Sequence, residues 1–278
     1  MIVLARGGDS DSIDWFEVVF VVLWFFVLGG VIARAFGVSI MGFPRGHRRA
    51  LVASVFGGLA ALALALHRYG AKEVRQDWGA VFGLILLGGL WLIATMGLFP
   101  WLGLSLRHDA MEGRNPAALV SLLGGVIAIL LTFAGGNIGE GPSYWNNVFS
   151  AALGTGGVLC LWLLLEICAD VSTSIAEERD LASGMRLGGF LIAAGLILGR
   201  AVAGDWHSGT ATVRDFARDG WMAVPLWALA VILERLLRPS RRTPFPSWRA
   251  SGMLPALIYL ALAFGWVCYL GTWEGFVQ

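Results

Sequence analysis

The sequence predicts an all-α protein with several membrane-spanning helices, and three observations support this. Hydrophobic residues make up 57% of the 278 residues and charged residues only 14%, whereas soluble domains are about 45–50% apolar and about 25% charged. Long stretches contain no Asp, Glu, Lys or Arg, and the polar segments between them are too short to form a separate domain. We therefore expect one polytopic membrane domain over residues 1–278.

The spans follow from the thickness of the bilayer, because a hydrocarbon layer of about 30 Å requires roughly 20 apolar residues in a helix. Four stretches without charged residues are long enough to span unaided: 79–106, 115–138, 141–165 and 250–273. Four more carry a charge near one or both ends: 15–36, 50–66, 181–204 and 221–237. The sequence thus predicts eight transmembrane helices.

Charges near the ends of these spans are compatible with a membrane, since long basic side chains can extend to the interface. In the stretch 181–204, Arg186 and Arg200 are separated by about 21 Å along a helix axis. We expect their guanidinium groups to reach opposite interfaces. Residues before Trp15 lack the basic and apolar segments of a cleaved signal peptide, so we expect the first helix to remain in the membrane.

The spans are spaced as a repeat. Tryptophans begin four of them, at Trp15, Trp78, Trp145 and Trp221, and are separated by 63, 67 and 76 residues. This spacing predicts four helical hairpins, at about residues 15–68, 78–136, 145–204 and 221–273.

Paired glycines recur in both helices of the first three hairpins, whereas the fourth has no such pair after Arg249 and Pro255 interrupts its last helix. Small residues let helices approach closely in lipid, so these pairs predict helix packing. The alternative is that they mark unwound segments that line an ion or substrate site. The pairs are Gly29 and Gly30, Gly57 and Gly58, Gly88 and Gly89, Gly124 and Gly125, Gly156 and Gly157, and Gly188 and Gly189.

Basic residues predict the orientation, because Lys and Arg concentrate in cytoplasmic loops. The turns inside the four hairpins hold 13 of the 20 basic residues. Both termini are therefore predicted outside. Tryptophans at the outer ends of helices are expected in an interfacial belt, and the others are expected to fill gaps between helices. The belt comprises Trp15, Trp78, Trp145, Trp206, Trp221 and Trp273, and the second group Trp24, Trp91, Trp162, Trp227 and Trp266.

Ionisable residues within a bilayer are candidates for function because they are costly there. Glu166 is the deepest acid that we identify, four residues before Asp170. Its carboxylate could bind or relay a cation, or it could pair with an arginine of a neighbouring helix. The candidate partners are Arg34, Arg186 and Arg235. We favour an ion pair, with Glu166 and Arg186 as the candidate site.

The densest group of charges is the arginine cluster of the last hairpin turn: Arg235, Arg238, Arg241, Arg242 and Arg249. Arginines beside a membrane attract anionic headgroups, so the first four are candidate lipid contacts. The cluster is more typical of an ordinary topology anchor. A net charge of +1 leaves no basic domain for nucleic acid.

The sequence shows no sign of a cofactor, disulfide or catalytic motif. The histidines fall at helix ends or in loops, where they are unsuited to hold a buried haem. A metal site of His67 and His207 with Glu73 or Asp205 has no supporting ligand spacing. Cysteines lie only within or at the ends of spans, without a Cys-x-x-Cys pair, and no Walker loop or hydrolase motif occurs. We predict no catalytic, cofactor or metal residues.

About residues 79 to 205 resemble a family of bacterial inner-membrane proteins, the YjfL-like domain-of-unknown-function 350 family. The resemblance rests on the segment from Glu112 to Leu119 with the following Gly124-Gly125, and on the small-residue segment from Leu187 to Gly195. It implies two repeated hairpins in a bacterial inner membrane, and it implies no particular activity. The outer hairpins look like further copies of the same unit.

Minimal loops, abundant glycine and scarce buried charge favour a non-enzymatic scaffold or accessory subunit of a membrane assembly. Its expected partners are membrane lipids and either further copies of itself or other membrane subunits. The alternative is an ion channel or small-solute transporter, favoured by the hairpin repeats and by Glu166.

Overall fold

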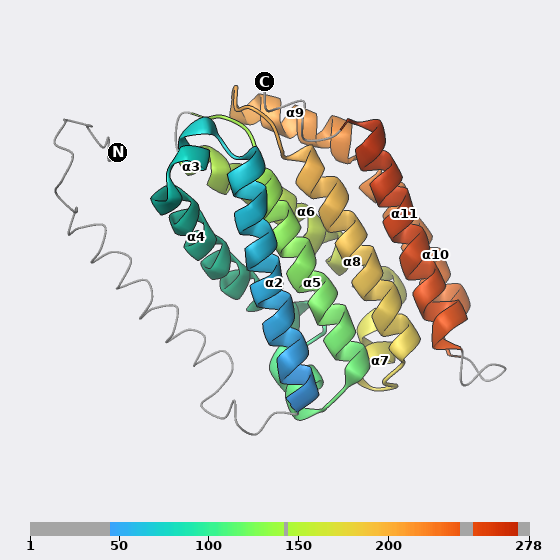
Figure 1. Cartoon of the computed structure of the whole chain (residues 1–278). Coiled ribbons are helices and arrows are strands. Elements are labelled where there is room, and N and C mark those ends of the chain that lie inside the picture. The colour runs from blue at the N-terminus through green and yellow to red at the C-terminus, as the bar shows by residue number, and fades with distance from the viewer. Residues whose placement is uncertain (1–44, 142–143, 240–246, 272–278) are drawn as a thin grey trace. The chain divides into compact units, whose positions relative to one another are not determined.

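The computed structural model describes residues 45–141, 144–239 and 247–271, all within one compact unit, Ser39–Gln278. Its long helices are α2 (Arg45–Tyr69), α4 (Trp78–Met96), α5 (Pro116–Gly136), α6 (Tyr144–Ala169), α8 (Leu181–Ala201), α10 (Ala223–Leu237) and α11 (Leu254–Tyr269) (Figure 1). Shorter elements join them: α3 (Lys72–Gln76), the 3-10 turn η2 (Phe99–Leu102), the π-helical η3 (Leu106–Glu112) and η4 (Trp248–Met253), α7 (Val171–Ala176) and α9 (Gly209–Gly220). Apart from one bridge between Gly70 and Gly139, these residues contain no β-structure.

The prediction of an all-α protein with several spanning helices is confirmed for this part of the chain. Within it, 6 helices are long and apolar enough to cross a membrane, and α9 with α10, bent by 46°, forms a seventh if the two are one span. The predicted first span, 15–36, and both termini lie outside the described residues. The number eight and the orientation therefore remain predictions.

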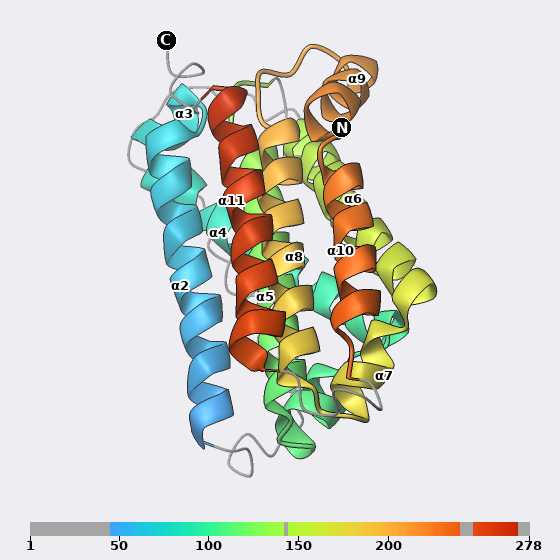
Figure 2. The same ribbon diagram turned by 90° about the vertical axis from the view of Figure 1, so that its right-hand side faces the viewer.

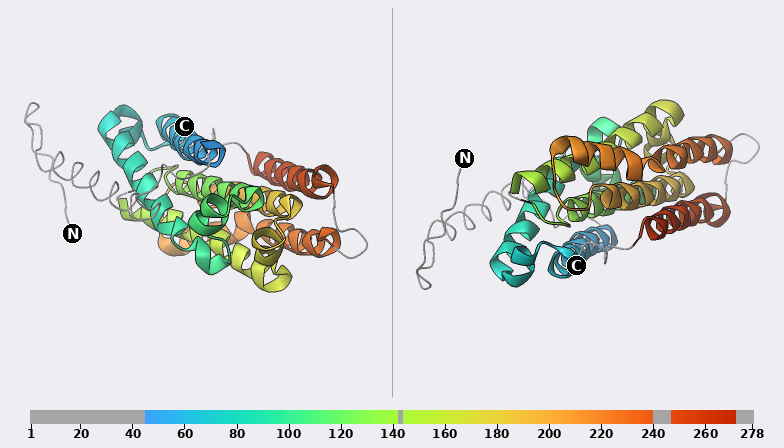
Figure 3. Two further views of the ribbon diagram at one scale, coloured as in Figure 1. Left: turned by 90° about the horizontal axis from the view of Figure 1, so that it is seen from below. Right: turned by 90° about the horizontal axis from the view of Figure 1, so that it is seen from above.

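The helices that close each predicted hairpin, α2, α5, α8 and α11, run in one direction and pack as consecutive neighbours (Figures 1 and 3). The helices between them return in the opposite direction: α4 packs on α2 and α5, α6 on α5 and α8, and α10 on α6 and α8. Figure 2 shows α8 flanked by α10 and α11. Consequently α8 contacts more of the described helices than any other helix does.

The contact between α5 and α8 is the most extensive between two described helices, and glycine makes it possible. A Cβ atom on Gly124 would lie 2.5 Å from the Gly188 carbonyl oxygen, and one on Gly135 would lie 2.6 Å from the Gly199 carbonyl carbon. Real Cβ atoms essentially never approach backbone this closely. The two backbones therefore gain van der Waals contact along their length that any larger residue would prevent.

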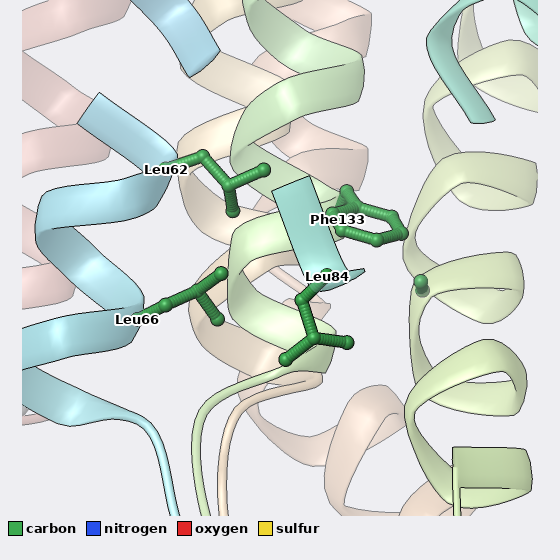
Figure 4. Close-up of a cluster of buried hydrophobic side chains, with 5 residues drawn as sticks. Leu62, Leu66, Leu84 and Phe133 are labelled. Carbon is green, nitrogen blue, oxygen red and sulfur yellow. The ribbon is translucent and has the colours of Figure 1, made fainter. Parts of the chain in front are cut away.

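Larger apolar side chains fill the space beside this contact. Leu62 and Leu66 of α2 meet Leu84 of α4 and Phe133 of α5, together with Ala151 of α6, and each of the five is at most 2% exposed (Figure 4). The cluster joins four helices. It explains why the first two described hairpin helices, α2 and α4, remain attached to the central pair despite being little buried elsewhere.

Tryptophan exposure separates the two predicted groups only in part, because Trp206 of the belt is half-buried, as are Trp91, Trp227 and Trp266 of the second group. Trp78, Trp145 and Trp221, which begin spans or their flanking turns, are 69%, 67% and 51% exposed. Trp162 is 1% exposed and its ring lies 5.0 Å from that of Phe99. The exposed group matches an interfacial belt and the buried one fills space between helices. Trp15, Trp24 and Trp273 lie outside the described residues.

Candidate functional site

A buried ion pair between α8 and α10 is the most concentrated polar chemistry in the described spans. Arg186 and Glu234 are each 2% exposed. The Arg186 Nε donates to Glu234 Oε2 at 2.6 Å, and Nη2 donates to Oε1 at 3.0 Å. Two parallel hydrogen bonds of this kind match the planar guanidinium to the carboxylate, which makes the pair specific as well as strong.

The remaining donors of Arg186 are satisfied by neighbouring groups. Nη1 donates to the Ser251 carbonyl oxygen in η4 at 2.5 Å, and Nη2 also lies 2.7 Å from Ser183 Oγ. The Ser183 hydroxyl lies within hydrogen-bond distance of both Glu234 Oε1, at 2.7 Å, and Asp180 Oδ2, at 2.8 Å. The cluster therefore connects α8, α10 and η4.

Local sequence positions each member of this cluster. Asp180 caps α8, because its carboxylate accepts hydrogen bonds from the backbone N–H groups of Ala182 and Ser183. This starts the helix so that Ser183 and Arg186, three residues apart, lie on the same face. Glu234 lies one helical turn after Ala230, which is 3% exposed, so the buried stripe of α10 carries the acid inward.

Tyr259 of α11 lies close to the pair. Its side chain is fully buried, its ring packs edge-on against Phe190 at 6.3 Å, and its hydroxyl has no hydrogen-bond partner among the described residues. Arg186 and Glu234 both influence it electrostatically. The hydroxyl is therefore a polar group beside the cluster that the described side chains do not satisfy.

The structure does not bring the two predicted site residues together, because Arg186 takes Glu234 as its carboxylate partner. Glu166 lies at the end of α6 and accepts two hydrogen bonds from Ser172, from the backbone N–H at 2.9 Å and from the hydroxyl at 2.5 Å. These bonds cap the first turn of α7. In the described part of the chain, Glu166 thus stabilises the break between α6 and α7.

Arg186 and Arg200, which we expected to reach opposite interfaces, lie towards opposite ends of α8, but both side chains are buried against protein. Arg186 is 2% exposed and Arg200 is 6% exposed. Arg200 Nη2 donates to the Leu270 carbonyl oxygen and Nε to that of Gly271, each at 3.3 Å. The last carbonyl oxygens of a helix accept no hydrogen bond from within that helix. Those at the end of α11 can therefore accept hydrogen bonds from the buried guanidinium in place of water.

Two of the predicted lipid-binding arginines are engaged with the protein. Arg235 donates to the Cys168 carbonyl oxygen at 3.0 and 2.5 Å. Arg238 donates to the carbonyl oxygens of Ala169 and Asp170 at 3.3 and 3.2 Å. These are the last carbonyls of α6, which the helix itself leaves without donors. The predicted contacts Arg241 and Arg242 lie outside the described residues.

Most of the predicted packing glycines do contact a neighbouring helix. A Cβ atom would lie within 4 Å of another helix or segment at Gly58, Gly88, Gly124, Gly125, Gly157, Gly188 and Gly189, but would meet no described atom within 4 Å at Gly57, Gly89 and Gly156. Gly29 and Gly30 lie outside the described residues. The sequence pattern did not point to Gly135, Gly184, Gly195 and Gly199, which make equally close contacts between α5 and α8.

The sequence analysis also missed a chain of hydrogen-bonded polar side chains between α4, α5 and α6. Trp91 Nε1 of α4 donates to Thr155 Oγ1 of α6 at 3.0 Å, and Thr155 Oγ1 lies 3.0 Å from Thr132 Oγ1 of α5. Thr132 in turn donates to the Ile129 carbonyl oxygen at 3.0 Å. The chain of hydrogen bonds ties three helices and ends on backbone, so each of its groups is satisfied. No sequence signal reveals it, because single threonines in apolar helices are common.

Glu234 could have been identified from its position. It lies eight residues after Leu226 and four after Ala230 on one helical stripe, and both of these are buried. An acid on the buried stripe of a span requires a cationic partner. We did not identify Glu234 from the sequence because the adjacent Arg235 and Arg238 make this segment resemble an ordinary basic turn.

The described residues contain no group of three or more His, Cys, Asp or Glu side chains arranged to hold a metal ion. His67 stacks on Trp78 with ring centroids 4.8 Å apart, and His207 Nδ1 lies 3.1 Å from the Asp205 carbonyl oxygen. Comparison of the chain with known protein families, with curated proteins and with solved structures finds no match.

Proposed function

We propose that the protein is a non-enzymatic component of a bacterial inner membrane, built from four hairpin repeats, that packs against copies of itself or other membrane subunits as a scaffold or accessory subunit. The observation that best supports this is glycine on outward helix surfaces. Among the described residues, a Cβ atom would meet no other atom within 4 Å at Gly57 of α2, Gly89 of α4, Gly156 of α6 and Gly265 of α11. Such positions allow another helix to approach closely in lipid.

The ionisable side chains of the described spans also support this function over ion conduction. An ion path needs polar groups that can exchange partners. Arg186 and Glu234 instead form a closed bidentate pair, and Glu166 holds the start of α7. These groups stabilise one arrangement of the helices.

The test is purification in a gentle detergent, with the mass of the intact particle and of any companion proteins measured. We expect either a mass above that of one chain or a stoichiometric partner. At least one of the variants Gly57→Leu, Gly156→Leu and Gly265→Leu should lose that association while keeping its thermal midpoint. Ala94→Leu adds similar bulk at an exposed position of α4 and should change nothing. A lone monomer would contradict the proposal.

The alternative, a channel or small-solute transporter, is favoured by one observation. The α9–α10 pair bends by 46° at Gly220 to Ala223, and broken helices line the binding sites of repeat-built transporters. It predicts ion or solute flux in liposomes that Glu166→Gln abolishes. Flux absent from the unaltered protein would eliminate this alternative.

A further inference from the structure

The hydroxyl of Ser183 lies at the centre of the buried cluster between α8 and α10. Its oxygen is within hydrogen-bond distance of three ionisable side chains: Arg186 Nη2 at 2.7 Å, Glu234 Oε1 at 2.7 Å and Asp180 Oδ2 at 2.8 Å. Ser183 is fully buried and Glu234 is 2% exposed. Each of the three contacts is a hydrogen bond only if a proton lies between its two atoms.

These contacts need more protons than the hydroxyl and the guanidinium supply. A serine hydroxyl donates one proton, and its oxygen can accept the N–H of Arg186. Both contacts with the acids have the length of a full O–H···O hydrogen bond, so the single hydroxyl proton cannot serve both. If Asp180 and Glu234 were both ionised, one carboxylate oxygen would face the hydroxyl oxygen with no proton between them. One of the two acids therefore supplies a proton.

Charge contacts distinguish the two acids. Glu234 accepts hydrogen bonds from Arg186 with both of its oxygens, at 2.6 and 3.0 Å, which favours its ionised form. The closest guanidinium contact of Asp180 is longer, 3.7 Å from Arg186 Nη2. The extra proton therefore belongs to Asp180, and Ser183 donates to Glu234. The Asp180 side chain is 11% exposed, so a proton can reach it from solvent.

Other ionisable groups of the surrounding elements do not alter this proton count. Arg179, Arg235 and Arg238 donate to backbone carbonyl oxygens, and Arg249 lies over an indole ring. Tyr259 interacts electrostatically with the Arg186–Glu234 pair. The count depends only on the atoms around the Ser183 hydroxyl, so it holds whatever further charges lie nearby.

We propose that Asp180 binds a proton at neutral pH and donates it to Ser183 Oγ, which makes the start of α8 a proton-binding site. Loss of this proton places two oxygens in contact without a hydrogen bond, and it weakens the contact between α8 and α10. A rise in pH therefore loosens this end of the helix pair. The inference is independent of the scaffold function, because the proton count is the same whatever the protein does.

The first test is infrared spectroscopy of the full-length protein in detergent at a series of pH values. A protonated carboxylic acid has a C=O stretching band distinct from that of a carboxylate. We expect this band at neutral pH and its loss as the pH is raised. Asp180→Asn should lack the band. Asn caps helices as well as Asp does and has an N–H for Ser183, so the thermal midpoint at neutral pH should be retained.

Glu177→Gln, which removes an exposed carboxylate three residues earlier, is the matched control and should keep the band. The pH dependence of unfolding gives a second readout. Above about pH 5 an unfolded aspartate has released its proton. Because the folded protein keeps this proton, the unfolding equilibrium constant should rise by up to tenfold per pH unit until the folded state also releases it. Asp180→Asn should lose this dependence and Glu177→Gln should keep it.

Three results would overturn the proposal. Absence of the band from the unaltered protein at neutral pH would mean that both acids are ionised. A band of equal intensity in Asp180→Asn would assign the proton to another carboxyl group. An unchanged pH dependence of unfolding in Asp180→Asn would show that the cluster does not take up the proton on folding.

Discussion

At the residue scale, the described spans use charge to hold helices together. A buried ion pair adds little net stability relative to apolar side chains, because removing two charges from water costs nearly as much as their attraction returns. Removal of one partner is different, since it leaves a lone charge in an apolar interior. Arg186 and Glu234 therefore specify which helices meet at α8 more than they increase the free energy of unfolding.

This view predicts opposite outcomes for single and double substitutions. Glu234→Gln should lower the free energy of unfolding by about 3–5 kcal/mol, whereas Arg186→Leu combined with Glu234→Leu should recover most of that loss. Unfolding in detergent, followed by circular dichroism, measures both. Glu178→Gln, at an exposed carboxylate, serves as the control. A double variant no more stable than Glu234→Gln would show that the pair contributes more than specificity.

Outside the spans, the turn η3 contains a carboxylate with a shifted pKa. Arg107 donates a hydrogen bond to Glu112 at 2.9 Å and His108 Nδ1 lies 3.0 Å away, and these contacts, Arg107 first, lower the pKa of Glu112 below its usual 4.5. Because the folded pKa is depressed, the stabilisation is present above the unfolded pKa and is lost as pH falls through the folded one.

Arg107→Gln should therefore raise the pKa of Glu112 towards its usual value, since the largest cause of the shift is removed. Titration of the side-chain carboxyl carbon by NMR in micelles measures this. Arg114→Gln removes an exposed charge that does not contact Glu112 and should leave its pKa unchanged. Equal shifts in the two variants would attribute the effect to net charge.

At the element scale, the structure explains why some glycines matter and others do not. Pairing alone does not distinguish them, because whether a glycine faces a partner depends on the rotation of its helix. Gly188 faces the α5 backbone, whereas Gly156, in an equivalent pair, faces open space. The periodicity of small residues predicts that close packing occurs, but only the docked helices show which glycines take part.

Two glycine substitutions test this difference. Gly135→Ala places a Cβ atom 2.6 Å from the Gly199 carbonyl carbon, and separating α5 from α8 to admit it should cost about 1–3 kcal/mol. Gly156→Ala meets no neighbour and should be neutral or stabilise its helix by up to about 1 kcal/mol. Thermal midpoints in one detergent compare them. Equal destabilisation by both would argue against the α5–α8 contact.

At the scale of the whole molecule, hydrogen bonds join the predicted second, third and fourth hairpins. Hydrogen bonds from Asn115 to Ile175, Arg186 to Ser251 and Arg235 to Cys168 join residues 60, 65 and 67 apart. These intervals resemble the predicted repeat spacing of 63 to 76 residues. The four-hairpin repeat itself remains a prediction.

Orientation is also a property of the whole molecule. With the native cysteines replaced by serine, Ser208→Cys should react with a membrane-impermeant thiol reagent from outside, because it lies at the end of the bundle with fewer arginines. Ser247→Cys, in the arginine-rich last turn, should react only after the membrane is permeabilised. Labelling of Ser247→Cys from outside would reverse the predicted topology.

Composition and hydropathy were sufficient to predict the fold class and the positions of the described spans, because a helix that crosses lipid must satisfy its own backbone and present an apolar surface throughout. The choice of partners was decided by tertiary structure alone. Arg186 could reach several carboxylates as judged from sequence, and the packing of α8 against α10 selected Glu234 and left Glu166 with Ser172. Side chains pair across helices according to helix rotation and register, and these depend on the packing of all neighbours together.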